Sequence, residues 1–230
     1  MFRTDNCVIL DTETTGFRAD DGTPAECVEL AYRNPVTRHL FLQRYKPSRP
    51  MQWGAIAVHH ILPEELESCP PSTQALVDAP VNYTYWIGHN IDYDWEILGS
   101  PPKVRRICTL ALARSVWPQL DSHSQTAMMY FIQGANPATR ERLRNAHSAE
   151  TDIDSCEILL EALIGQLNPE SLDALWQLSE EARIPKIMTF GKFKGQPISA
   201  VDRGYASWYL KQTDTDPYVI AAFRRAGLIR

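Results

Sequence analysis

The sequence predicts an α/β protein, in which a mixed β-sheet is flanked by helices and a small C-terminal appendage follows. Three observations predict this class. Two β-prone runs joined by a short turn come early, helical patterns alternate with strand candidates after them, and the chain becomes glycine-punctuated and basic after Ile184-Pro185. Antiparallel strands followed by alternating helices and strands describe a mixed sheet with helices packed on it. We expect a first domain over 1–183 and an appendage over 184–230.

The N-terminal part of the chain supplies the antiparallel strands. The apolar run from Cys7 to Leu10 predicts a first strand that ends near Thr12. Segments 25–33 and 38–46 are rich in β-prone residues and are separated by the short turn NPVT. A link this short favours an antiparallel hairpin, since a parallel crossover needs about a dozen residues.

The remainder of the first domain alternates strands and helices. A proline-rich loop at 46–54 precedes an aromatic-rich strand candidate at 82–89, a helix begins at 95–98, and a short strand candidate lies at 105–109. Apolar residues at helical spacing then predict helices at 109–117, 122–133, 148–167 and 170–182. In the appendage, the stretch 204–212 has a helical pattern.

Composition limits the class of protein. With 230 residues and 44% hydrophobic content, the chain can bury one good core and have some chain left for an appendage. The polar first residues, MFRTDN, predict no signal peptide, and no run approaches the roughly 20 apolar residues of a membrane helix. Five cysteines without a C-x-x-C pair argue against a disulfide framework and a zinc ribbon. We expect a soluble, cytoplasmic protein with no membrane partner.

Charge is distributed unevenly along the chain. Residues 1–182 hold 14 basic and 25 acidic residues, a net charge of −11, whereas residues 183–230 hold 9 and 3, a net charge of +6. A basic tail on an acidic body indicates a polyanionic partner. A solvated C-terminal face is the alternative interpretation.

The first strand ends on two acids, Asp11 and Glu13. Side chains alternate across a strand, so these two point the same way and repel each other beside an apolar run. A hard divalent cation such as Mg²⁺ or Mn²⁺ would remove that repulsion. The alternative is a solvent-exposed strand end with ordinary acids.

A second acidic motif is GHNIDYDWEIL at 88–98. It places Asp94 at the expected entry to a helix, just after a buried strand candidate. Aspartate at that place is also a good N-terminal cap, which is the alternative role. Asp92 competes with Asp94 for any functional role.

A third motif lies at the start of the helix predicted over 148–167. Asp152 interrupts a stripe that otherwise holds apolar residues such as Cys156 and Leu163. A carboxylate on an inward stripe is costly unless it is paired or bound to a metal. His147 lies on the loop that leads into this helix, and the alternative for it is an ordinary surface histidine.

Together, D-x-E-T-T-G, H-N-x-x-Y-D and H-x-x-x-x-D, in this order over roughly residues 5–167, resemble the DEDDh branch of the DnaQ-like 3′–5′ exonucleases. Segments 107–120 and 189–212 resemble its exodeoxyribonuclease X subgroup. The resemblance implies a ribonuclease-H-like fold. It also implies metal-dependent release of nucleoside 5′-monophosphates from the 3′ ends of single- and double-stranded DNA, in DNA repair. Dimers occur in this family, so a homodimer is compatible with it.

The resemblance assigns roles residue by residue. Asp11, Glu13, Asp94 and Asp152 match the metal ligands, which hold two Mg²⁺ ions per active site, with Mn²⁺ as a substitute. His147 matches the histidine that takes a proton from the attacking water. Asp92 stands where the family usually has a small residue, so it remains the alternate to Asp94.

Contacts to the terminal nucleotide also follow from the resemblance. AIAVHHI at 55–61 resembles the family segment A-x-x-x-H-x-I, in which Val58 and His59 match the positions that touch base and sugar. Core packing is the alternative for Val58. Thr14, Thr15 and Gly16 follow the metal strand, where the backbone approaches the 3′ hydroxyl.

Two further pairs are expected to contact DNA. Phe17 and Arg18 would stack on a base or wedge a duplex end, and a loop phenylalanine packed on the body is the alternative. Lys192 and Lys194 in FGKFKG combine with aromatics and glycines, which suits phosphate contact and base stacking. A small structural hairpin with solubilising lysines is the alternative for that segment.

Two other functions remain open at this stage. The same chemistry could act on RNA ends as a 3′–5′ exoribonuclease, because the residue types do not separate ribose from deoxyribose. A non-catalytic module that binds nucleic-acid ends is the third hypothesis, although such a module has no need of His147 and four carboxylates together.

Overall fold

The computed structural model describes residues 6–17, 22–144, 148–213 and 215–230. The chain forms two compact units, 1–179 and 180–230, which we call the body and the C-terminal module. The division falls inside helix α8 (Leu172–Arg183), and the sequence analysis placed it at residue 183. Among the helices of the described ranges, none has the length and apolar character needed to cross a membrane.

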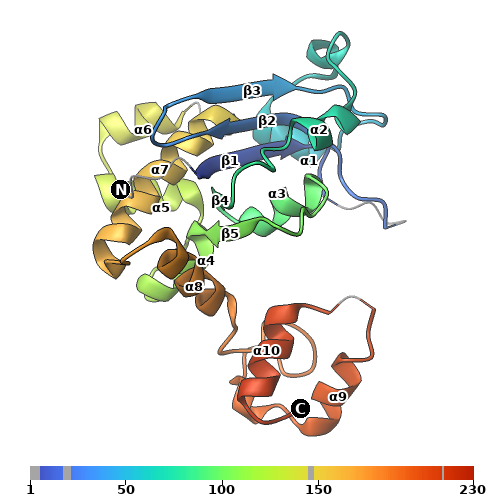
Figure 1. Ribbon diagram of the computed structural model, residues 1–230, viewed down its shortest axis with the longest axis vertical. Helices are drawn as coiled ribbons and strands as arrows, with labels where there is room; N and C mark the ends of the chain where they lie inside the picture. The colour runs from blue at the N-terminus through green and yellow to red at the C-terminus, as the bar shows by residue number, and fades with distance from the viewer. Residues whose placement is uncertain (1–5, 18–21, 145–147, 214) are drawn as a thin grey trace. The chain divides into compact units, whose positions relative to one another are not determined.

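The body is built on a five-stranded sheet with the order β3-β2-β1-β4-β5 (Figure 1). Strand β1 pairs antiparallel with β2 and parallel with β4, β2 pairs antiparallel with β3, and β4 pairs parallel with β5. The strands are β1 (Cys7–Thr14), β2 (Cys27–Arg33), β3 (Leu40–Arg44), β4 (Tyr85–Gly88) and β5 (Arg105–Cys108). The predicted mixed sheet, with its antiparallel hairpin first, is confirmed. Strand β1 continues two residues past the predicted end at Thr12, so Glu13 lies inside it.

Helices flank the sheet in the body (Figure 1). In the described part of the body they are α1 (Trp53–His59), α2 (Ala75–Asp78), α3 (Ile91–Ile97), α4 (Thr109–Val116), α5 (Gln125–Gln133), α6 (Pro137–Leu143), α7 (Ala149–Leu167) and α8, with short 3-10 turns at 63–66 and 72–74. Helix α7 packs against β1, β2, α4 and α5, while α3 packs against β1, β4 and β5. These contacts bring the starts of both helices to the central strand.

Helix α7 is fixed to strand β2 by buried charge. The Arg33 guanidinium on β2 pairs with Asp154 and Glu157 of α7, and Arg38 also pairs with Glu157. Arg33 is buried, so its charge is compensated by carboxylates of one helix. The network holds α7 along the antiparallel side of the sheet.

Some boundaries differ from the prediction for local reasons. The loop predicted over 46–54 gives way to helix α1 at Trp53, and α3 begins at Ile91 instead of residue 95. Asn90 adopts the left-handed conformation (φ 71°), which turns the chain from β4 directly into α3. Asp94 therefore lies in the first turn of α3 and not at its N-cap, so the capping alternative is wrong. Helix α6 was not predicted.

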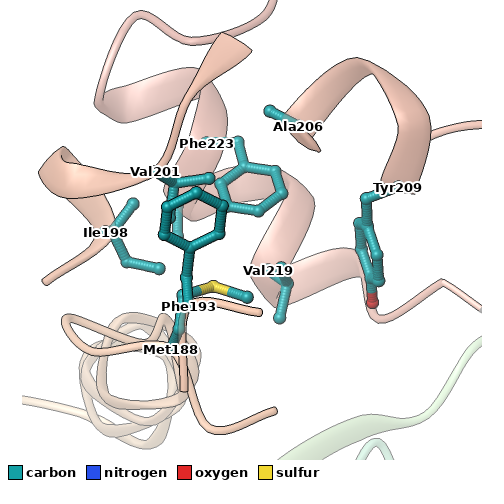
Figure 2. Close-up of a cluster of buried hydrophobic side chains, with 9 residues drawn as sticks. Met188, Phe193, Ile198, Val201, Ala206, Tyr209, Val219 and Phe223 are labelled. Carbon is teal, nitrogen blue, oxygen red and sulfur yellow. The ribbon is translucent and has the colours of Figure 1, made fainter. Parts of the chain in front are cut away.

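The C-terminal module has an apolar core of its own. Helices α9 (Arg203–Tyr209) and α10 (Pro217–Arg225) enclose it together with a 3-10 turn at 198–200. Figure 2 shows side chains from the segment before α9, from α9 and from α10 converging around Phe223. The buried members are Met188, Phe193, Ile198, Val201, Ala206, Tyr209, Val219, Ala222 and Phe223. Helix α10 was not predicted, and it contributes Phe223, a fully buried ring.

Candidate active site

Three carboxylates meet where strand β1 faces the start of helix α7. Asp11 and Glu13 lie two residues apart on β1, so the strand presents both on one side. Asp152 comes from the first turn of α7. Each of the three offers an oxygen, and these oxygens lie within 4.8 Å of one another. All three residues are half-buried, which leaves the cluster reachable from solvent.

Asp94 is the buried fourth carboxylate beside this cluster. Its Oδ1 accepts hydrogen bonds from the Thr12 backbone N–H at 3.0 Å and from Thr12 Oγ1 at 2.7 Å. These bonds fasten the start of α3 to strand β1. After burial, the negative charge of Asp94 is the next largest cause that raises the pKa of Asp11, so the two carboxylates interact.

Asp92 pairs with an arginine instead. Its Oδ1 lies 2.6 Å from Arg106 Nη1 on β5, and the Arg106 guanidinium stacks 4.2 Å from the centre of the Trp95 ring. The two acids of the D-Y-D sequence therefore point in different directions from the first turn of α3. Asp94 faces the carboxylate cluster, and Asp92 neutralises an arginine on the neighbouring strand.

The electrostatics of the cluster favour a cation. Burial, followed by the charges of Asp94, Asp152 and Glu13, raises the pKa of Asp11 well above its ordinary value. Burial and the neighbouring carboxylates, Asp152 first, raise the pKa of Glu13 to about 8. Crowded, half-buried carboxylates hold protons at neutral pH unless a positive charge compensates them. Their hard oxygen ligands suit a divalent ion such as Mg²⁺ or Mn²⁺, so the residues fit the metal that the resemblance implies.

Glu29 is a buried acid beside these four carboxylates that was not among the predicted site residues. It lies on β2 directly opposite Glu13 and is 3% exposed. Its carboxylate accepts hydrogen bonds from Arg44 Nε at 2.7 Å and from the Ala149 backbone N–H at 3.2 Å. Glu29 therefore ties the first residue of α7 to the sheet beside the cluster. An acid inside the apolar run CVELAY was the available signal.

Gln125 was also missed. At the start of α5, its Nε2 donates to the Asp152 backbone carbonyl at 2.5 Å and lies 3.3 Å from Asp152 Oδ1. This contact orients one carboxylate of the cluster. No pattern in the sequence distinguishes Gln125 from a surface glutamine, because its partner lies 27 residues away.

A pocket of about 310 Å³ adjoins the carboxylates. It is lined by Thr12, Glu13, Thr14, Gly16, Phe17, Gln52, Gly54, Ala55, Val58, His59 and Tyr93. Five of the predicted nucleotide contacts thus line one pocket. They come from the end of β1 with the residues after it, and from α1: Thr14, Gly16, Phe17, Val58 and His59. Thr15 does not line it, since its Oγ1 accepts the Glu26 N–H at 3.0 Å. Arg18 lies outside the described residues.

Gln52 and Tyr93 fix the backbone conformation of the residues that follow β1. Gln52 Oε1 accepts the Phe17 N–H at 3.2 Å, and Tyr93 Oη donates to the Gly16 carbonyl at 2.7 Å. Gly16 has φ 131°, and a Cβ there would lie 2.2 Å from Gln52 Oε1, so only glycine fits. Phe17 is 80% exposed, with its ring 6.3 Å from that of Tyr93. Packing of Phe17 into the body is thereby excluded.

Val58 and His59 occupy different environments in the same pocket. Val58 is 47% exposed, which excludes core packing as its role. His59 is buried, and its Nδ1 accepts the Ile61 N–H at 3.0 Å. Burial lowers the pKa of His59, so its ring stays neutral at pH 7. The pocket therefore offers an apolar wall and a neutral imidazole.

The remaining predicted residues lie elsewhere. His147 is outside the described residues; the described chain resumes at Ser148, whose Oγ accepts the Thr151 N–H and caps α7. Lys192 and Lys194 are exposed in the C-terminal module. Lys192 Nζ lies 3.6 Å from Asp202 Oδ2 and 5.0 Å from the centre of the Phe193 ring.

Comparison with solved structures agrees with the fold. Exonuclease X in complex with 5′ overhanging duplex DNA matches with a TM-score of 0.57 and 23% identity over 75% of this chain and 99% of its own. Cell-death related nuclease 4 matches with a TM-score of 0.50 and 15% identity over 70% of this chain and 64% of its own. The chain shares the α/β fold of these nucleases, and the predicted ribonuclease-H-like fold is confirmed. No family model matches the sequence, and no curated protein sequence matches it either.

Proposed function

We propose that the chain is a metal-dependent 3′–5′ exodeoxyribonuclease of the DnaQ-like DEDDh type. The observation that carries the proposal is the meeting of Asp11, Glu13 and Asp152 within 4.8 Å, beside buried Asp94 and an open pocket. The shared fold supports it, because the two solved structures compared above are nucleases and one of them was solved with duplex DNA.

The four carboxylates would hold the metal. Asp11, Glu13, Asp94 and Asp152 supply oxygen ligands for two Mg²⁺ ions, or for Mn²⁺ in their place. When bound, two such ions stabilise the attacking and leaving oxygens of an in-line phosphoryl displacement. Gln125 keeps Asp152 oriented, and Thr12 keeps Asp94 oriented, before any ion arrives.

His147 is the proposed general base. It takes a proton from the attacking water, whose oxygen forms a bond to the terminal phosphorus. The P–O3′ bond to the preceding nucleotide then breaks, O3′ keeps the electron pair and takes a proton to become the new 3′ hydroxyl of the shortened strand, and a nucleoside 5′-monophosphate leaves. A histidine with a pKa near 6.5 suits this role at neutral pH. The assignment rests on the motif H-x-x-x-x-D, since His147 lies outside the described residues.

The pocket would receive the terminal nucleotide. Val58 offers an apolar contact to the base, and the neutral His59 ring offers a polar contact to the sugar. Thr14 and Gly16 line the same hollow at the end of β1. Thr15 follows Thr14 in this segment, but its backbone N–H donates to the Glu26 carbonyl at 2.9 Å and its carbonyl accepts the Gln52 N–H at 2.8 Å, so its contribution is to hold the segment in place.

Phe17 and Arg18 are proposed to fray duplex ends. An aromatic ring that is 80% exposed beside the pocket is placed to stack on a base, and stacking contributes about 1–3 kcal/mol per base. We expect Phe17→Ala to lose more activity on blunt duplex than on single strands. Equal losses on both substrates would contradict this role.

In the C-terminal module, Lys192 and Lys194 are proposed to contact DNA phosphates. The DNA repair role, the cytoplasmic location and a homodimer stay predictions from the sequence and its resemblance.

The decisive test uses 5′-labelled single-stranded DNA, duplex DNA and RNA of matched sequence, with Mg²⁺, with chelator, or with Asp11→Asn. The proposal predicts a ladder shortening from the 3′ end of DNA that disappears with chelator and with the variant. Preferential shortening of RNA would instead make the chain an exoribonuclease. Tight binding without shortening would contradict catalysis and favour a binding module.

A further inference from the structure

We propose that the C-terminal module binds single-stranded nucleic acid on one surface, formed by Tyr205 and Trp208 of α9 and the turn 191–194. We call it the α9 surface. The inference rests on the proposed function for the identity of the nucleic acid as DNA, and it adds the residues and the binding mode.

The α9 surface is a continuous series of ring contacts. Lys192 Nζ lies 5.0 Å from the Phe193 ring, whose centre is 5.1 Å from that of Tyr205 in an edge-on arrangement. The Tyr205 ring lies 5.2 Å from the Trp208 ring. A Cβ on Gly191 would lie 2.1 Å from Tyr205 Oη, so the turn is pressed against the tyrosine and only glycine allows it.

Trp208 is not needed to fill the core of the module. The core is closed by Ala206 and Tyr209 of the same helix, which are buried around Phe223 (Figure 2). Trp208 is not among the buried residues of this core and is 51% exposed, while the Tyr205 ring, which packs partly against the core, supports one part of it. A large ring that is held in place yet left open to solvent marks a contact site.

The positive net charge of the module favours a polyanionic partner. Residues 180–230 hold nine basic and five acidic residues, a net charge of +4, whereas residues 1–179 have a net charge of −9. Lys192 and Lys194 are part of the turn that packs on Tyr205. Lys211 comes one helical turn after Trp208, and its N–H donates to the Trp208 carbonyl. Asp202 is an acid near this surface: its Oδ1 accepts the Tyr205 N–H at 2.7 Å and caps α9, and its Oδ2 lies 3.6 Å from Lys192 Nζ.

Supported aromatic faces with lysines around them are the combination that binds single strands. Unpaired bases expose π-faces that stack on such rings without regard to sequence, and the lysines meet the phosphates. A duplex presents its phosphates but not its base faces. The α9 surface therefore favours a single strand over a blunt duplex, and it would hold the strand that the active site shortens.

The test measures binding by the full chain in chelator, so that no hydrolysis occurs. The probes are labelled dT20, rU20 and a blunt hairpin duplex, followed by fluorescence anisotropy over a salt series. We expect Trp208→Leu to weaken dT20 binding by about tenfold or more, and Trp208→Phe to stay within about threefold of the unchanged chain. Ile187→Ala, at a residue 52% exposed in the same module, is the matched control and should bind normally.

The lysines give a second readout. The double variant Lys192→Ala, Lys194→Ala should reduce the steepness of log affinity against log salt by about 1.4 for a single strand. Trp208→Leu should leave that slope unchanged, because stacking releases no counterions.

Equal affinities of the unchanged chain and Trp208→Leu for dT20, with the fold intact by thermal melting, would overturn the inference. Tighter binding of the blunt duplex than of dT20 would also overturn it. The arms rU20 and dT20 report whether the sugar matters. A chain that binds through Trp208 but shortens no DNA with Mg²⁺ would contradict the proposed function alone, whereas an active chain indifferent to Trp208 contradicts only this inference.

Discussion

The body and the C-terminal module use charge in opposite ways. In the body, Asp11, Glu13, Asp94 and Asp152 converge at partly or fully buried positions, where their charges repel one another. In the module, apolar side chains fill the interior and the lysines stay in solvent. Burying like charges together destabilises the folded state, and among the described residues such a cluster of carboxylates lies in the body. The comparison indicates that the carboxylate cluster exists for a cation and that the module offers a surface.

Replacing a carboxylate of the cluster should have the largest effect. Asp11→Asn removes one ligand and one repelling charge, so DNA shortening should be lost. Because burial and like charges raise the pKa of Asp11, the same variant in chelator at pH 8 should unfold at a higher temperature than the unchanged chain. Calorimetry in chelator measures this. A lower stability of the metal-free variant would mean that the cluster is not strained by charge.

The next largest effect concerns the proposed base. His147→Ala should lower the single-turnover rate by about 10²–10⁴-fold, the usual range for loss of a general base. Metal affinity should be unaffected, which separates this variant from Asp11→Asn. A rate within a few-fold of the unchanged chain would show that His147 does not take the proton.

An outer contact of the cluster should matter less. Gln125→Ala removes the contact between the Gln125 amide and the Asp152 carboxylate, and we expect metal affinity or turnover to fall by about 10–100-fold. Titration with Mn²⁺ and single-turnover rates measure the two quantities. Gln133→Ala, at an exposed position on the same helix, is the matched control. Equal behaviour of the two variants would remove Gln125 from the site.

The smallest effect is a pH dependence of stability. Glu13 has an ordinary pKa of 4.5, and its pKa is raised to about 8 in the folded protein. Between these values the folded, metal-free chain binds more protons than the unfolded chain, so its stability falls as pH rises. Metal displaces those protons. The rise in Tm on adding Mn²⁺ should therefore grow from pH 6 to pH 8, and a rise independent of pH would contradict the assignment.

The sequence predicted the elements whose signals are local. The run into Asp11 and Glu13, the NPVT turn and the helix around Asp152 each carry their pattern within a dozen residues. Glu29 and Gln125 could not be assigned in this way, because their partners lie 120 and 27 residues away. The choice between Asp92 and Asp94 depended on one left-handed residue, Asn90, which started α3 earlier than the hydrophobic pattern indicated.

In the C-terminal module, too, part of the structure could not be predicted from local sequence patterns. Its basic, glycine-punctuated segment was visible in the sequence, and the alternatives of phosphate contact or structural hairpin could not be separated there. Helix α10 supplies Phe223 and closes the core, which leaves Trp208 outside. Which aromatics are interior and which are exposed depends on that packing.

Two acids of one sequence motif provide the sharpest test of the carboxylate site. Asp94→Asn and Asp92→Asn are assayed beside the unchanged chain for shortening of 5′-labelled single-stranded DNA with Mg²⁺. Asp94 contacts Thr12 and interacts with Asp11, whereas Asp92 pairs with Arg106 on the neighbouring strand. We expect Asp94→Asn to abolish shortening from the 3′ end and Asp92→Asn to retain it. Full activity of Asp94→Asn, or no shortening by the unchanged chain, would contradict the four-carboxylate exonuclease site.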